Sequence, residues 1–174
     1  MPTSYQPPTR GDSSDSQRTV SQTLTSNTSE DIATVGQLLA DKNTDVISVR
    51  PEDTLRQAVE ILSEKRIGAL VVTDDAGDLR GILSERDIVR KLAETPGQTL
   101  PQQVAENMTR EVQTCAPEDA LISVLRRMTD GRFRHMPVID HGKLCGMITI
   151  GDVIQYRLRS LEHEALQLKQ LIVG

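Results

Sequence analysis

Two short segments of the chain place a hydroxyl group and a carboxylate three residues apart. They read GILSERD at 81–87 and GMITIGD at 146–152, and both fit Gly-apolar-x-[Ser/Thr]-x-x-Asp. One interpretation is a helix N-cap, in which Ser84 or Thr149 caps the helix and Asp87 or Asp152 bonds back. The same geometry also suits a ribonucleotide. A helix N-terminus offers free N–H groups to an anion, and an ionised Asp accepts bonds from ribose hydroxyls.

Both segments close a longer sequence repeat. Residues 46–89 align with residues 112–154 at an offset of 66 as far as Asp74 and Asp140, and at an offset of 65 beyond them. The tripeptide Pro-Glu-Asp occurs at the same place in both copies. Two copies are too few for a solenoid, so we expect a compact pair of similar units.

Each copy predicts the order β-α-β-β-α. The first helix follows from the apolar spacing of Leu55, Ala58, Val59 and Leu62, which recurs in the second copy from Leu121. The last helix of each copy starts at Glu85 or Ile150. The strands are expected at 46–49, 69–73 and 79–83, and at 112–115, 136–139 and 144–148. A preceding helix over 34–41 and a long C-terminal helix over 151–172 complete a fold of mixed α/β (α+β) class.

This duplicated unit, its Gly-x-x-[Ser/Thr]-x-x-Asp ending and the segment RHMPVID at 134–140 resemble a CBS-domain pair, also called a Bateman module, over about residues 34–158. The resemblance implies tandem CBS repeats that pack through their sheets with pseudo-two-fold symmetry. It also implies clefts that bind adenosine-containing ligands. Ribose would then be held by Asp87 and Asp152, with Ser84 and Thr149 beside them.

The resemblance also implies contacts for phosphate and adenine. In relatives, a basic pair before the Pro-Val-Ile-Asp segment contacts phosphate, and here that pair is Arg134 and His135. The family's adenine contacts match Ile47, Ala69, Thr114 and Met136.

The two copies differ in charge. Arg86 comes from the first copy, whereas Arg132, Arg134 and His135 come from the second, so we expect phosphates to lie between the repeats and Asp87 to mark the better site. Two alternatives stay open: Arg132 as a solvated charge at a helix end, and His135 as a hydrogen-bonded strand residue.

Composition excludes several classes of protein. The chain has 20 basic and 25 acidic residues, a net charge of −5, whereas nucleic-acid binders normally carry a basic surplus. One Phe, two Tyr and no Trp argue against a base-stacking platform and an interfacial membrane helix. Two cysteines are too few for a disulfide framework, and no metal site is expected. We expect a cytoplasmic protein with no nucleic-acid or membrane partner.

The chain divides into four parts. A Ser-, Thr-, Pro- and Gln-rich tail over 1–31 is expected to be disordered, because it has too few large apolar residues to form a core. The first repeat with its preceding helix is assigned to 32–95 and the second repeat to 96–158. A helical extension covers 159–174, and its apolar residues favour a dimer contact. The resemblance likewise implies a homodimer.

The favoured function is a non-catalytic, stand-alone regulatory module that binds an adenine nucleotide and modulates another protein. AMP is the first candidate; ADP, ATP, NAD(H) and S-adenosylmethionine also fall within the family's range, and no further cofactor is required. The alternatives are an interaction scaffold with vestigial ligand sites and an enzyme acting on a nucleotide. The sequence favours the enzyme least, since it offers no catalytic residue in the form of a nucleophile beside a positioned base.

Overall fold

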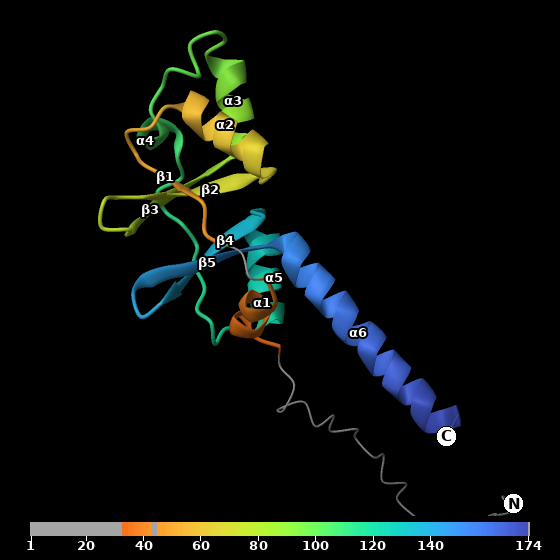
Figure 1. Cartoon of the computed structure of the whole chain (residues 1–174). Coiled ribbons are helices and arrows are strands. Elements are labelled where there is room, and N and C mark those ends of the chain that lie inside the picture. The colour runs from red at the N-terminus through yellow and green to blue at the C-terminus, as the bar shows by residue number, and fades with distance from the viewer. Residues whose placement is uncertain (1–32, 43–44, 174) are drawn as a thin grey trace, which may run out of the picture. The chain divides into compact units, whose positions relative to one another are not determined.

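The computed structural model describes residues 33–42 and 45–173, so the predicted tail lies outside the described residues. Among the described residues, the order of helices and strands follows the predicted repeat, except that the first strand of the second copy is absent and a short helix precedes that copy (Figure 1). In chain order the elements are α1 (Val35–Lys42), β1 (Ser48–Val49), α2 (Leu55–Lys65), β2 (Ala69–Thr73), β3 (Leu79–Ser84), α3 (Glu85–Glu94), α4 (Val104–Asn107), α5 (Leu121–Gly131), β4 (His135–Asp140), β5 (Lys143–Thr149) and α6 (Ile150–Val173).

Each repeat builds its own small sheet. In the first repeat, β1 pairs with β2 in parallel and β2 pairs with β3 antiparallel, so the order is β1-β2-β3. In the second repeat, β4 pairs antiparallel with β5. The place of β1 is taken there by a single parallel bridge between Cys115 and Val138, the positions equivalent to the paired Val49 and Val72.

The strand predicted at 112–115 is therefore reduced to one bridging residue. Cys115 keeps two ladder bonds, from its N–H to the Pro137 carbonyl at 3.1 Å and from the Ile139 N–H to its own carbonyl at 2.8 Å. In the first repeat the Val71 N–H of β2 also donates to the Ile47 carbonyl, at 3.4 Å. The equivalent residue of β4 is Pro137, which has no N–H, so this further ladder bond cannot form and the strand is shorter than predicted. The Thr114 carbonyl, which lies on the other side of the chain from the Cys115 ladder bonds, accepts a hydrogen bond from the Arg127 guanidinium.

Two separate apolar cores lie under these sheets. Equivalent positions on the two first helices are buried in both copies, as their spacing predicts: Leu55, Ala58 and Leu62 on α2, and Leu121, Val124 and Met128 on α5. Both helices end at an arginine in the left-handed conformation, Arg66 or Arg132. The repeat is thus a repeat of packing as well as of sequence.

The short helix that precedes each repeat packs against the other repeat. Val35 and Leu38 of α1 pack into the core of the second repeat, and the Gly36 N–H donates to the Pro117 carbonyl at 2.9 Å. Val104 of α4 packs into the core of the first repeat, and its N–H donates to the Asp53 carbonyl at 2.8 Å. Each unit is therefore completed by a helix from the other half of the chain (Figure 1).

The glycine that opens each motif sits where another segment approaches closely. A Cβ on Gly81 would come within 2.8 Å of the Thr109 carbonyl oxygen, because Ile82 and Thr109 exchange two backbone hydrogen bonds there. A Cβ on Gly146 would meet the Leu39 side chain of α1 at 2.8 Å. Both glycines thus make room for the segment that links or precedes the repeats.

Candidate functional site

The junction between β3 and α3 forms a capping box. The Ser84 hydroxyl donates to Asp87 Oδ2 at 2.6 Å and the Ser84 N–H donates to the same oxygen at 3.0 Å. In return the Asp87 N–H donates to the Ser84 hydroxyl oxygen at 3.4 Å. The capping box predicted for Ser84 and Asp87 is confirmed, and the ribonucleotide interpretation of the same geometry stays a prediction. Among the described residues, Asp87 Oδ1 accepts no hydrogen bond, so half of this carboxylate is free for another partner.

The junction between β5 and α6 has the same local geometry but a different partner. The Thr149 N–H donates to Asp152 Oδ2 at 2.8 Å, and the Asp152 N–H donates to the Thr149 hydroxyl at 3.1 Å. Lys42 of α1 adds an ion pair, with its Nζ 2.7 Å from Asp152 Oδ2 and 3.1 Å from the Met147 carbonyl. Burial raises the pKa of Asp152, but the hydrogen bonds from Lys42 and Thr149 outweigh burial and hold the pKa below its usual value.

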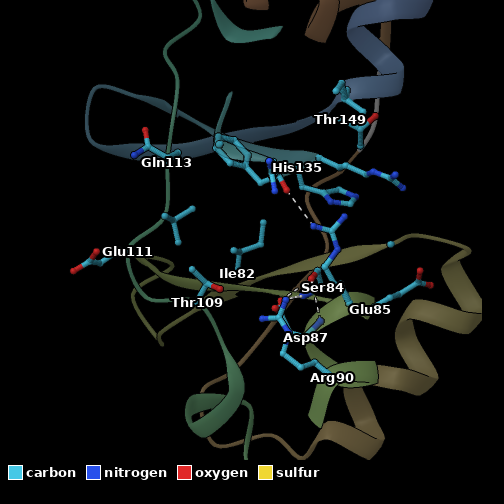
Figure 2. A pocket seen from close by; sticks show the side chains of 18 of the residues that line it. Ile82, Ser84, Glu85, Asp87, Arg90, Thr109, Glu111, Gln113, His135 and Thr149 are labelled. Carbon is cyan, nitrogen blue, oxygen red and sulfur yellow. Dashed lines mark hydrogen bonds between the residues drawn. The ribbon is translucent and has the colours of Figure 1, made fainter. Parts of the chain in front are cut away.

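Both junctions border one cavity of about 700 Å³ between the repeats (Figure 2). Residues of α3, of the linker after α4, of the end of α5 and of the β5–α6 junction form its walls. The lining residues are Gly68, Ile82, Ser84, Glu85, Arg86, Asp87, Arg90, Thr109, Glu111, Val112, Gln113, Gly131, Arg132, Phe133, Arg134, His135, Thr149, Ile150 and Gly151.

The cavity gathers positive charge from both repeats. Arg86 and Arg90 come from α3, whereas Arg132 and Arg134 lie between α5 and β4. The Arg86 guanidinium crosses between the repeats, since its Nη1 donates to the Arg132 carbonyl at 3.1 Å. Three carboxylates also line the walls, so the lining carries four arginines against three acids. Arginine favours phosphate because its planar fork of donors matches the phosphate oxygens.

His135 lies at the point where the repeats meet. A Cβ placed on Gly68 of the first repeat would come within 3.4 Å of the His135 ring. Figure 2 shows His135 on the same side of the cavity as Thr149. Burial lowers the pKa of His135, and the Lys42 cation lowers it further, while the carboxylates of Asp152 and Glu85 oppose that shift. The ring is therefore held in its neutral form more strongly than an exposed histidine.

Seven of the predicted site residues line this cavity together. They are Ser84, Arg86, Asp87, Arg132, Arg134, His135 and Thr149. Positively charged residues of both repeats therefore line one cavity between the repeats, where the phosphates were expected.

Five predicted residues lie elsewhere. Asp152 borders a second cavity of about 230 Å³ between α1 and α6, next to Lys42. Ala69 and Met136 have no exposed surface and belong to the packed interior, and Ile47 packs against the core of the first repeat. Thr114 is half-buried and holds Arg127 through its carbonyl. The structure does not bring these five to the walls of the larger cavity.

Sequence reasoning missed several wall residues. Arg90 had a usable signal, because it follows Arg86 by four residues and so shares its helix face. The linker residues Thr109 and Glu111 carry no such signal, since they belong to no motif and reach the cavity only through the fold. Val112 and Gln113 begin the strand predicted at 112–115, but the strand pattern does not indicate that they line a cavity.

Comparison with known proteins identifies the family of this chain. The family model described as "CBS domain" matches residues 35–94 and again residues 103–159. The chain therefore belongs to the CBS-domain family and carries two such domains.

Individual relatives agree with this assignment. The mitochondrial CBS domain-containing protein CBSX3 of Arabidopsis thaliana is 34% identical over 127 residues, which are 71% of this chain but only 62% of that protein. The crystal structure of the CBS-domain containing protein ATU1752 from Agrobacterium tumefaciens is 40% identical with a TM-score of 0.70, and the match covers 72% of this chain and 99% of that one.

A third relative is known with ligands. It is the CBS domain pair of protein MJ0100, solved in complex with 5′-methylthioadenosine and S-adenosyl-L-methionine. It is 25% identical with a TM-score of 0.66, and the match covers 75% of this chain and 99% of that one.

Within residues 33–42 and 45–173, we find no helix with the length and apolarity of a membrane span.

Proposed function

We propose that this chain is a non-catalytic regulatory module that binds an adenine nucleotide in the cavity between its two CBS domains and modulates a partner protein. The carrying observation is that one cavity of about 700 Å³ collects the free half of the Asp87 carboxylate and four arginines from both repeats. That volume lies within the range of about 300–1,000 Å³ for small-molecule sites. The ligands of the MJ0100 domain pair support an adenosyl group as the common element.

The ribose and the phosphate of a nucleotide each have a matching partner in the cavity. Ser84 occupies only Oδ2 of Asp87, so Oδ1 is available to accept a ribose hydroxyl. The arginines supply charged donors for phosphate, which favours AMP, ADP, ATP or NAD(H) over S-adenosylmethionine. The latter has no phosphate and carries a positive sulfonium group, so its single carboxylate is the one group that the four guanidinium groups would attract.

Binding would act by joining the two repeats. Arg86 already links α3 to the end of α5, and a phosphate between Arg86 and Arg134 would add a second link. A ligand that binds one arrangement of the repeats more tightly shifts the population towards it, and that shift is the regulatory output.

Calorimetry of the full chain against AMP, ADP, ATP, NAD(H) and S-adenosylmethionine tests this proposal. We expect saturable binding of the phosphate-bearing ligands, and chromatography afterwards should recover them unchanged. Turnover of the ligand would identify an enzyme. Absence of binding across the panel would contradict the proposal and favour the scaffold alternative.

The two motif aspartates provide a matched pair of variants. Asp87→Ala and Asp152→Ala each remove the carboxylate that bonds back to the start of a helix, worth about 1 kcal/mol of stability. Asp152→Ala in addition removes the ion pair with Lys42 and so costs more stability. Only Asp87 borders the larger cavity, so Asp87→Ala should weaken nucleotide binding about tenfold to a hundredfold through loss of charged hydrogen bonds. Asp152→Ala should leave the affinity unchanged. Equal affinities of the two variants would exclude Asp87 as the ribose partner.

The phosphate assignment needs its own variants. Arg86→Ala combined with Arg134→Ala should weaken AMP binding, because it removes one guanidinium from each side of the cavity. Arg126→Ala is the control, since Arg126 is exposed on α5 and does not line the cavity. Wild-type affinity of the double variant for AMP would contradict the assignment.

A further inference from the structure

Helix α6 carries an apolar stripe that is separate from the nucleotide cavity. The stripe residues are spaced alternately by four and three positions, which is the a/d pattern of a coiled coil. They are exposed, with relative exposures of 55% for Leu158, 60% for Leu168 and 83% for Ile172. The α6 stripe consists of Ile154, Leu158, Leu161, Ala165, Leu168 and Ile172.

Within residues 33–42 and 45–173, no other element covers this stripe. Helix α6 is anchored at its start by Val153 and Tyr156, which pack into the core of the second repeat. Every residue from Leu161 to Ile172 is exposed, and Figure 1 shows α6 running away from the sheets. At 3.6 residues per turn, the centre of the stripe lies roughly 130° around the helix from Val153, Tyr156 and Ser160. A second helix could therefore lie along the stripe without displacing the core.

We propose that two copies of this chain pair through the α6 stripe as a parallel two-stranded coiled coil. With Leu158 at an a position, Arg157 and Glu164 occupy g positions, and Glu162 and Lys169 occupy e positions. In a parallel pair each g residue faces the e residue five positions later on the other helix. Arg157 then faces Glu162 of the second copy, and Glu164 faces Lys169 of the second copy.

The charges select both the partner and the orientation. In the parallel pair two attractive charge contacts form on each side of the coiled coil. Each helix supplies both the positive and the negative residues of these contacts, so a second copy of the chain is the partner that matches them. A fully overlapped antiparallel pair would instead place Glu162 against Glu162 and Glu164 against Glu164. Like charges at these positions are unfavourable, so the parallel arrangement is favoured.

Two leucines of similar exposure give a matched test. Leu168 belongs to the stripe and is 60% exposed, whereas Leu166 lies on a different face and is 58% exposed. In sedimentation velocity of the full chain, Leu168→Asp should raise the dimer dissociation constant at least about a hundredfold, because two buried leucines are lost per dimer. Leu166→Asp should have little effect. A monomeric wild type at micromolar concentrations, or equal behaviour of the two variants, would overturn the proposal.

Cross-linking distinguishes this interface from a dimer formed elsewhere on the molecule. In a Cys145→Ser background, Leu168→Cys should form a disulfide-linked dimer on mild oxidation, because equivalent d positions meet in a parallel pair. Leu166→Cys should not. A dimer that persists in Leu168→Asp and does not cross-link through Leu168→Cys uses another surface and refutes the coiled coil. Nucleotide binding is measured separately, so its loss or retention does not bear on this result.

The charge pairing has its own test. Lys169→Glu should weaken the dimer, since it places Glu164 opposite a second carboxylate. Adding Glu164→Lys to that variant should restore the dissociation constant by exchanging the two charges. If the second substitution weakens the dimer further, the parallel register is wrong.

Discussion

Lys42→Met tests whether the Lys42–Asp152 ion pair fixes α1 onto the second repeat. Lys42 Nζ is 2.7 Å from Asp152 Oδ2 and 3.1 Å from the Met147 carbonyl, and both side chains of the pair are 24% exposed. Methionine keeps most of the apolar stem and removes the charge. Hydrogen bonds to charged groups contribute about 1.5–3 kcal/mol each when partly buried. Because Asp152 keeps its bonds from Thr149, we expect the free energy of unfolding to fall by about 1.5–3 kcal/mol in total.

Urea unfolding at neutral pH measures this loss, and the midpoint of thermal unfolding should fall by roughly 3–12 °C. Lys65→Met is the control: Lys65 is a half-exposed lysine on α2 whose carboxylate partner, Glu64, is 73% exposed. A surface pair of that kind contributes little, so this variant should stay within about 0.5 kcal/mol of the wild type. Adding Asp152→Asn completes a double-mutant cycle for the pair, which should give a coupling energy of at least about 1 kcal/mol.

The pH dependence supplies an independent check of the same contact. The fold holds the pKa of Asp152 below 3.8, so its contribution to stability is fully present above about pH 3.8 and is lost as the pH falls through the folded value. The difference between wild type and Lys42→Met should therefore shrink in acid. A Lys42→Met protein as stable as the wild type, or a coupling energy of zero, would refute the view that this ion pair holds α1 in place.

Three further predictions concern the interior and the site. Burial holds the pKa of His135 below 6.5 in the folded protein. As the pH falls below 6.5, the unfolded chain therefore binds a proton more readily than the folded protein, and the free energy of unfolding should decrease. Urea unfolding at a series of pH values should show this decrease, and His135→Gln should make it smaller. Gly81→Ala should cost about 1–3 kcal/mol in urea unfolding, because the new methyl group meets the backbone carbonyl of Thr109 at 2.8 Å. Gly146→Ala should cost less, because it meets only the movable end of Leu39; the reverse order would contradict this packing argument.

Much of the fold follows from local pattern. The apolar spacing that starts at Leu55 and Leu121 places two helices correctly, because the side chains that repeat every three or four residues share one helix face. The hydroxyl and the carboxylate of GILSERD form the capping box because both lie within one helical turn. Short-range geometry of this kind depends on neighbours in the chain, so the sequence is sufficient to predict it.

Features that depend on contacts between residues far apart in the sequence, or on very short elements, were not predicted. The predicted second-copy strand is reduced to a bridge because Pro137 of β4 has no N–H to continue the ladder that Val71 continues in the first copy. The four-residue helix α4 was not predicted, since it is too short to show an apolar period and has no side-chain cap. The adenine residues assigned by resemblance, such as Ala69 and Met136, lie on strands that are buried almost throughout, and only the packing of these strands shows that the two side chains do not reach the cavity.

The duplication, most of the helix and strand order, and the hydroxyl and carboxylate at both helix starts follow from the amino-acid sequence. The difference between the two carboxylates depends on tertiary contacts: Asp87 borders the large cavity, whereas Asp152 is paired with Lys42. The physical reason is that α1 crosses to the second repeat and brings a cation to a carboxylate 110 positions away along the chain. No local propensity encodes that contact, because it depends on which core the apolar face of α1 joins.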